Sequence, residues 1–276
     1  MSENKVNNFQ HYRQLSAPST EVYGSAGKKL YLNPDDVRGW WIYKLSGTQA
    51  KKIDTVVRVC KANKVDLFMD IGANYGEFSI MVADIVDRVV CFEPNPFVFP
   101  YLEKSFEHLE NVETFEKAIS VESGEDAICN FTFNKHYSGG GSIIDGRPQK
   151  WKHKGDGNNL QFQKKDFYTT IPVDAANLVE FLEKQEWQSL FIKLDCEGAD
   201  WEIVKSLEDY FSKLSVGFGV QKKWHIMFES DSSIHARHEV VWFSEHDESE
   251  LYKFCKKTNS QPIHTHFSTD DILISN

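Results

Sequence analysis

This sequence of 276 residues lacks the features that mark disulfide-rich, zinc-binding, membrane-spanning and secreted proteins. Its five cysteines are odd in number, widely spaced and never in a C-x-x-C pair, which argues against a disulfide scaffold and a zinc ribbon. No apolar run approaches the length that spans a bilayer, and residues 1–20 lack the apolar core of a secretion signal. We therefore expect no membrane insertion and a location in the reducing cytoplasm.

Positive charge is also scarce. The chain has 31 Lys and Arg against 41 Asp and Glu, so its formal net charge is −10. Because nucleic acids are held by clustered cations, this balance argues against a nucleic-acid partner bound by general electrostatics. A small-molecule partner is expected instead, and the sequence leaves the oligomeric state open.

The order of polar and apolar segments predicts one large α/β domain with additions. Residues 1–20 are polar and are predicted to form a mobile tail, whereas residues 21–64 are aromatic-rich and end in a helical spacing, as in a segment packed against the domain. Residues 65–276 alternate apolar strands with helices. This predicts a doubly wound, mostly parallel sheet with an antiparallel C-terminal hairpin built from residues 262–267 and 271–275.

Some stretches are harder to assign. Residues 133–166 lack a clear periodicity and are predicted to be an insertion. Within them, the glycine-rich residues 138–142 are either a loop at the edge of a ligand or an exposed linker. The pattern also predicts one strand over residues 112–118, a helix over residues 175–184 and another from about residue 198 to 210.

The most informative stretch is residues 65–79, where an apolar run ends at Asp70 and breaks into a glycine-bearing turn. A strand, a tight turn and a helix start of this kind hold nucleotide-like ligands at the carboxyl end of an open α/β sheet. Asn74 stands where a dinucleotide fingerprint has its middle glycine, which disfavours a pyrophosphate and suits a ligand with an amino-acid part. The alternative is an ordinary turn with Asp70 as a helix cap.

Glu93 ends the next predicted strand, about 20 residues after the glycines, where a carboxylate accepts hydrogen bonds from ribose hydroxyls. Alone, such a residue is more often a solvated strand-end charge or a helix cap. Together with the Asp70 turn at the matching spacing, it favours a ribose-containing ligand.

Four segments in order resemble the FkbM family of S-adenosylmethionine-dependent methyltransferases. They are Asp-Ile-Gly-Ala-Asn-Tyr-Gly at 70–76, Phe-Glu-Pro-Asn at 92–95, Lys-Ala-Ile-Ser at 117–120 and Phe-Ile-Lys-Leu-Asp-Cys-Glu-Gly-Ala-Asp at 191–200. The resemblance covers about residues 65–230. It implies a class I methyltransferase fold, S-adenosylmethionine as cofactor, and an oxygen of a small-molecule or saccharide acceptor, often a sugar hydroxyl.

The resemblance also implies site residues. The turn after the first strand surrounds the methionine part of the cofactor, Glu93 holds its ribose, and Ala118 and Ile119 lie near its adenine. The full predicted cofactor site comprises Asp70, Gly72, Ala73, Asn74, Gly76, Glu77, Phe78, Glu93, Asn95, Ala118 and Ile119. The chain departs from the family pattern at Cys196, where an aliphatic residue is usual, and at Asp200, where Glu is commoner.

Methyl transfer to a hydroxyl needs a group that accepts the hydroxyl proton. We predict Asp195 as this base, Glu197 and Glu229 as residues that orient the acceptor, and His235 as a reserve base. The alternatives are cofactor positioning for Asp195 and helix capping for Glu197. Clustered carboxylates also suit Mg²⁺ or Ca²⁺, but spacing alone does not support such a site, and we predict no metal.

The leading hypothesis is an O-methyltransferase that acts on a sugar or a glycosylated metabolite. A NAD-dependent oxidoreductase would use the same sheet edge and Glu93, although Asn74 counts against it. A non-catalytic nucleotide-binding module would keep the cofactor site while its acceptor-side carboxylates have no chemical role.

Overall fold

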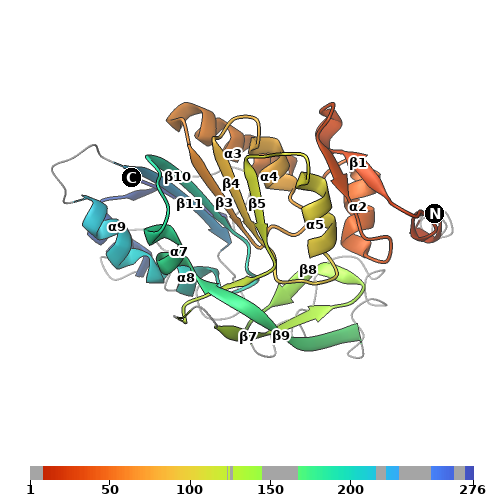
Figure 1. Cartoon of the computed structure of the whole chain (residues 1–276). Helices are drawn as coiled ribbons and strands as arrows, with labels where there is room; N and C mark the ends of the chain where they lie inside the picture. The colour runs from red at the N-terminus through yellow and green to blue at the C-terminus, as the bar shows by residue number, and fades with distance from the viewer. Residues whose placement is uncertain are drawn as a thin grey trace.

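The computed structural model describes residues 9–122, 124, 127–144, 167–215, 222–229, 250–263 and 271–276. Within them, a central sheet flanked by helices meets a second, smaller sheet at one end (Figure 1). None of the helices in these ranges is long and apolar enough to cross a membrane.

The central sheet has seven strands in the order β12-β13-β11-β10-β3-β4-β5. Five neighbouring strands run parallel, namely β11 (Lys223–Glu229), β10 (Ser189–Leu194), β3 (Leu67–Ile71), β4 (Arg88–Phe92) and β5 (Val112–Phe115). At one edge, β13 (Asp271–Ser275) pairs antiparallel with both β11 and β12 (Gln261–Ile263). The mostly parallel sheet is confirmed, while the predicted turn between the last two strands lies outside the described residues.

Helices cover both faces of this sheet. Successive side chains of a strand point to opposite faces, and in the central strands most side chains on both faces are apolar. Phe68 of β3 packs in a cluster with α3 (Ala50–Asn63), α4 (Glu77–Val82) and α5 (Phe99–Phe106). Its neighbours Leu67 and Met69 pack in a second cluster with α7 (Leu178–Glu183), α8 (Asp200–Ser206), α9 (Glu208–Ser215) and α10 (Glu250–Thr258). The sheet is therefore doubly wound, as the alternation of strands and helices predicts. A single helix was expected where α8 and α9 follow one another.

The N-terminal segment contains β1 (Ser19–Glu21), a 3₁₀ turn (Val22–Gly24), β2 (Lys29–Tyr31) and α2 (Val37–Leu45). The predicted tail over residues 1–20 differs from the structure: residues 9–13 are helical, and residues 1–8 lie outside the described ranges. Tyr12 is 1% exposed and donates a hydrogen bond to the Asn33 carbonyl over 2.7 Å. One buried aromatic residue thus anchors a stretch whose composition is polar.

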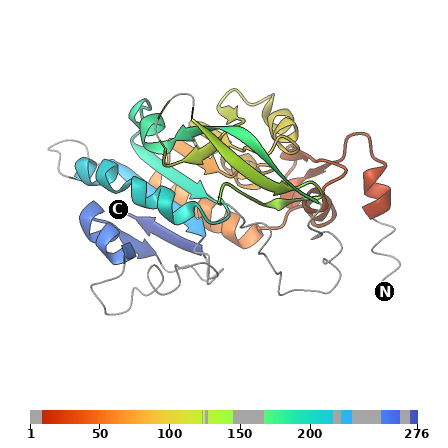
Figure 2. The same ribbon diagram turned by 90° about the horizontal axis from the view of Figure 1, so that it is seen from below.

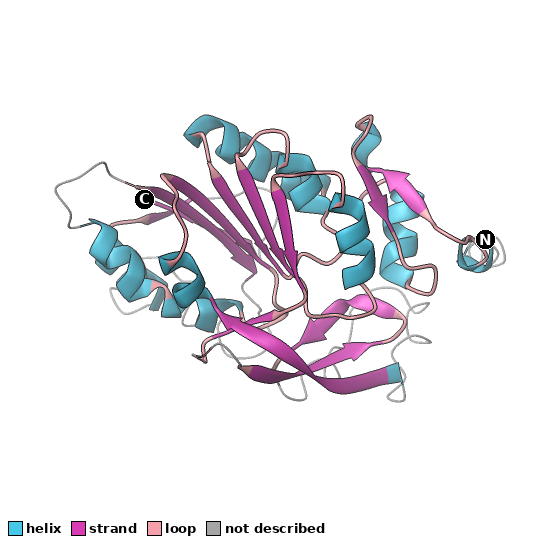
Figure 3. Cartoon of the chain, viewed as in Figure 1, coloured by secondary structure: helices cyan, strands magenta, loops and turns pink. Residues whose placement is uncertain are grey.

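The second sheet has four strands in the order β6-β9-β7-β8. These are β6 (Ala118–Ser120), β7 (Ile128–Asn134), β8 (Tyr137–Ser142) and β9 (Tyr168–Asn177). Viewed from below, this sheet lies across the end of the central sheet (Figure 2), and the arrows of the central strands point toward it (Figure 3). It therefore forms a second wall at the carboxyl ends of the parallel strands.

This second sheet corrects three expectations. The predicted strand over residues 112–118 is split between β5 and β6, which belong to different sheets. The predicted helix over residues 175–184 starts only at Leu178, because residues 175–177 pair with β6 and the Asn177 side chain caps the helix. The glycine-rich residues 138–142 form most of β8, and the rest of the predicted insertion, residues 145–166, lies outside the described residues.

Candidate active site

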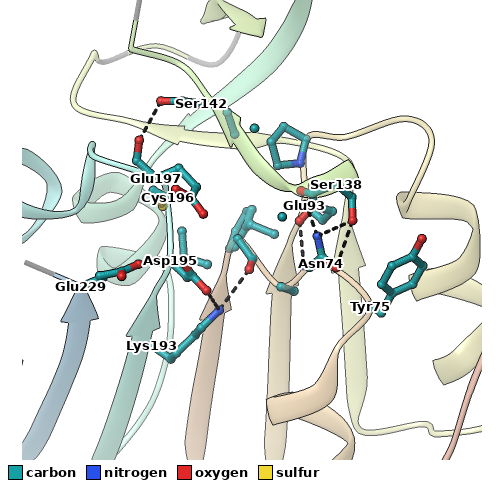
Figure 4. Close-up of a pocket in the computed structure, with 18 of the residues that line it drawn as sticks. Asn74, Tyr75, Glu93, Ser138, Ser142, Lys193, Asp195, Cys196, Glu197 and Glu229 are labelled. Atoms are coloured by element: carbon teal, nitrogen blue, oxygen red, sulfur yellow. Dashed lines mark hydrogen bonds and ion pairs between the residues drawn. The ribbon is translucent and has the colours of Figure 1, made fainter. Parts of the chain in front are cut away.

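A cavity of about 340 Å³ opens where β3, β4 and β10 end. This volume lies within the range of small-molecule sites. Its walls come from the turns after β3 and β10, from β6 and β8 of the second sheet, and from the N-terminal segment. The labelled side chains gather in two groups, with Asn74, Glu93 and Ser138 on one side and Asp195, Glu197 and Glu229 on the other (Figure 4).

The turn after β3 touches the turn after β10 through backbone atoms. Gly72 has φ +71°, and a Cβ atom there would collide with the carbonyl oxygen of Asp195 and lie 2.9 Å from its carbonyl carbon. Only glycine allows both the left-handed backbone and this close approach. Asn74 is also left-handed, with φ +51°, and its backbone N–H donates to Glu93 Oε2 over 2.7 Å. This hydrogen bond directly joins the turn after β3 to Glu93, the two parts of the predicted cofactor site.

Glu93 is 5% exposed and lines the cavity. Its two carboxylate oxygens accept hydrogen bonds from the backbone N–H groups of Asn95, over 2.9 Å, and Asn74. Burial raises the pKa of Glu93 to about 7, although these two hydrogen bonds oppose the rise. Because a carboxylate has about four lone-pair positions, it can accept two further hydrogen bonds from a ligand.

Asp36 links the N-terminal segment to the cofactor turn, a role that the sequence did not indicate. It is 3% exposed, caps α2, and accepts hydrogen bonds from Tyr75 Oη over 2.7 Å and Ser138 Oγ over 2.6 Å. The Asn74 side-chain amide in turn donates to Ser138 Oγ over 3.2 Å. An aspartate just before a helix signals a cap, but its tertiary partners have no signal in the sequence.

Asp70 does not line the cavity. It is fully buried behind the turn, where Oδ1 lies 3.1 Å from Lys193 Nζ and Oδ2 accepts from Ser79 Oγ over 2.7 Å. Lys193 lines the cavity instead and donates to the Gly72 carbonyl over 3.0 Å. Burial by itself lowers the pKa of Lys193, but the negative charges of Asp70 and Asp195 and the hydrogen bond to Asp70 together outweigh burial and raise that pKa above its usual value.

The turn after β10 carries the predicted acceptor-side residues. The Asp195 side chain is 30% exposed and its Oδ2 lies 3.7 Å from Lys193 Nζ. Glu197 has φ +50°, and its carbonyl accepts a hydrogen bond from Ser142 Oγ over 2.9 Å. The capping contacts in this turn belong to Asp200, which accepts from the backbone N–H groups of Cys196 and Gly198, each over 3.1 Å. Burial raises the pKa of Asp200 to about 6, helped by the charge of Asp195.

Glu77 joins α4 to the N-terminal segment. It is 4% exposed and accepts four hydrogen bonds: from Arg38 Nη2 over 2.9 Å, from Thr48 N over 2.7 Å, from Thr48 Oγ1 over 2.9 Å and from Tyr23 Oη over 3.1 Å. Arg38, Thr48, Gln49 and Lys52 line the cavity, and no motif in the sequence indicated them.

Most predicted site residues therefore meet at one cavity. Those that line it are Gly72, Ala73, Asn74, Glu77, Phe78, Glu93, Ala118, Ile119, Asp195, Glu197 and Glu229. Gly76 and Asn95 support it from behind, since Gly76 has φ +82° next to Phe106, and Asn95 donates to Glu93. His235 lies outside the described residues. Among the residues that the structure describes, no cluster of three or more His, Cys, Asp or Glu side chains is arranged to hold a metal ion.

The solved structures that match this chain are distant from it in sequence. An O-methyltransferase of tomaymycin synthesis from Streptomyces achromogenes is 10% identical, with 83% of this chain and 80% of that chain covered and a TM-score of 0.39. An O-methyltransferase from Bacillus cereus is 11% identical, with 83% and 81% covered and a TM-score of 0.37. A methyltransferase from Leishmania major is 7% identical, with 98% and 81% covered and a TM-score of 0.41.

No curated protein matches the chain. Its sequence does match the methyltransferase FkbM domain over residues 70–250, which is well over half of its length. This range begins in β3 and contains both turns and all of β10, and the chain thus belongs to the FkbM family of S-adenosylmethionine-dependent methyltransferases.

Proposed function

We propose that this methyltransferase acts on a hydroxyl oxygen of a sugar or a glycosylated metabolite. The observation that carries the proposal is the division of one cavity into two halves. Asn74 and Glu93 border one half, and the carboxylates of Asp195, Glu197 and Glu229 border the other. In this arrangement the residues of the first half would hold the cofactor, and the carboxylates of the second half would hold the acceptor next to it.

The first half fits the cofactor. Gly72 lets the turn after β3 pack closely against the backbone of Asp195 at the cavity, and Glu93 has lone pairs left for two ribose hydroxyls. Ala118 and Ile119 are each 3% exposed and offer an apolar surface for the adenine. When bound, S-adenosylmethionine supplies a methyl group on a sulfonium, which is already activated for transfer to an oxygen nucleophile.

The second half fits a hydroxyl acceptor. In our proposal Asp195 accepts the hydroxyl proton as the oxygen forms its bond to the methyl carbon and the bond from that carbon to the sulfonium sulfur breaks. No alkoxide builds up, and a neutral thioether is the leaving group. Lys193 steadies the Asp195 carboxylate from 3.7 Å. Glu197 and Glu229 accept hydrogen bonds from neighbouring hydroxyls, and ionised carboxylates only accept, which suits an acceptor rich in hydroxyl donors. Positioning of the two reactants supplies much of the remaining acceleration.

The acceptor is tested with a panel of sugars, nucleotide sugars and glycosylated metabolites incubated with the protein and S-adenosylmethionine. We expect one member to gain the mass of one methyl group, and its analogue that lacks the methylated hydroxyl to gain none. Methylation that persists in the deoxy analogue, or that maps to a nitrogen or carbon, would contradict an oxygen acceptor.

The base is tested by Asp195→Asn, which keeps the shape of the side chain and removes its basicity. We expect turnover to fall roughly 10²- to 10⁴-fold, the range typical of general acid–base catalysis, with S-adenosylhomocysteine affinity retained. Glu229→Gln is the matched control: it should mainly raise the KM of the acceptor. A wild-type rate in Asp195→Asn with intact cofactor binding rules out this assignment.

A further inference from the structure

Arg38 brings a partly buried positive charge to the cavity from outside the family-matched range. It lies in α2, its side chain is 16% exposed, and it borders the same cavity as Glu93 and Asp195. Within the described ranges, its one hydrogen bond runs from Nη2 to Glu77 Oε2. A guanidinium has five N–H donors, so most of its donor capacity is left for a ligand or solvent in the cavity.

Glu77 fixes the position of Arg38 and has no free acceptor position for a ligand. Glu77 accepts four hydrogen bonds, two from Thr48 and one each from Arg38 and Tyr23. A carboxylate has about four lone-pair positions, so Glu77 has no capacity left for a ligand hydroxyl or ammonium group. Its role is to hold the guanidinium in one orientation, which reduces the entropy that a bound ligand must lose.

The chemistry of this group selects its ligand. Guanidinium is always charged in proteins and presents a planar fork that matches a carboxylate. The charges of Glu77, Asp195 and Asp36 all favour the cationic form of Arg38, and they raise its pKa although burial opposes this. The N-terminal segment contributes a second basic residue to the cavity, Lys52.

We propose that Arg38 is the carboxylate-binding residue of this cavity. The carboxylate belongs either to the methionine part of the cofactor or to an acidic acceptor such as a uronic acid. This inference rests on the proposed function, because both ligands are those of a methyltransferase. It makes the segment that precedes the family-matched range a contributor to binding.

The test compares two ligands that differ in the carboxylate. S-adenosylhomocysteine carries the amino-acid part and methylthioadenosine lacks it. If the cofactor supplies the carboxylate, Arg38→Lys and Arg38→Gln should weaken S-adenosylhomocysteine about 10- to 100-fold in calorimetry and leave methylthioadenosine unchanged. Arg38→Lys keeps the charge opposite Glu77 and loses only the fork, so it separates binding from folding.

A second arm identifies an acidic acceptor. The complex with S-adenosylhomocysteine is titrated with D-glucuronate and, in parallel, with D-glucose. If the acceptor supplies the carboxylate, both Arg38 variants keep the S-adenosylhomocysteine affinity and selectively lose D-glucuronate. Unchanged binding in both arms overturns the inference and leaves the proposed function standing. Failure of the wild-type protein to bind S-adenosylhomocysteine contradicts the proposed function, and the inference with it.

Two control variants accompany these measurements. Tyr23→Phe removes one donor to Glu77 and the acceptor of the Gln49 backbone N–H, and Tyr23 does not itself line the cavity. It therefore reports on loosening of the Glu77 cluster and of the backbone next to it, with Arg38 unchanged. Arg58→Gln removes an exposed arginine that pairs with Asp54 on the surface of α3. Both should bind S-adenosylhomocysteine like the wild-type protein. A loss in Tyr23→Phe equal to that in Arg38→Lys would assign the effect to cluster stability and overturn the inference.

Discussion

Replacement of Gly72 by alanine tests whether the contact between the two turns is steric and essential. Gly72 has φ +71°, and the added Cβ would meet the backbone of Asp195 rather than a side chain that can rotate away. The substitution therefore forces the turn after β3 or the turn after β10 to move. Both turns line the cavity, so the movement separates the two halves of the site.

The chain contains a matched control for the backbone conformation. Gly24 has φ +68°, and a Cβ atom there would find nothing within 4 Å. Alanine at either position costs about 1–2 kcal/mol for the left-handed conformation. Only Gly72→Ala adds the cost of overpacking, about 1–3 kcal/mol. We expect the free energy of unfolding to fall by about 2–5 kcal/mol in Gly72→Ala and by about 1–2 kcal/mol in Gly24→Ala.

Urea unfolding of both variants measures this difference, and calorimetry with S-adenosylhomocysteine measures its effect on the site. A displacement of roughly 1 Å between reacting groups can cost about 100-fold in rate, so methyl transfer should fall by that order in Gly72→Ala and not in Gly24→Ala. Equal unfolding free energies in the two variants, with unchanged ligand affinity, would refute the steric explanation.

Two further predictions concern charge. Asp36→Asn should lower the free energy of unfolding by about 2–3 kcal/mol and weaken S-adenosylhomocysteine binding, because several donors lose a charged acceptor; the exposed neighbour variant Asp35→Asn should change stability by less than about 1 kcal/mol. For Glu93, burial raises the pKa from 4.5 to about 7, so the folded state binds more protons between these values and stability falls as pH rises from 4.5 to 7. Over the same rise, ligand affinity should increase as the carboxylate ionises for ribose. In calorimetry and pH-dependent unfolding, Glu93→Gln should abolish the affinity trend and reduce the stability trend, most clearly between pH 6 and 7, because the pKa of Asp200 is also raised, to about 6.

The sequence predicts the central sheet well because its signals are local. Each buried parallel strand is a short apolar run, and a glycine turn or a helical spacing follows it. The second sheet was harder to predict, because β6 and β9 pair across more than 50 residues of chain and Gly139 to Gly141 carry no side-chain alternation. Long-range pairing has no signal in the spacing of residues.

The turn after β3 shows which features of the site the sequence pattern does not predict. Asp70 ends the first strand in the sequence, and we expected it near the ligand. In the structure its Cα partner across the parallel ladder is Lys193, so the two side chains share one face of the sheet and form a buried ion pair. A lysine inside the apolar run of β10 was the available signal for this pair, but the register that joins the two strands was not.

This pairing gives the two turns one common support. Lys193 donates to the Gly72 carbonyl, lies next to Asp195, and is itself held by Asp70. The carbonyl that Lys193 holds and the carboxylate that we propose as the base therefore depend on a single ammonium group. Asp36 and Arg38 support the opposite wall from the N-terminal segment. A site built in this way should fail when either support is removed, even though Asp70 and Asp36 lie outside the cavity lining.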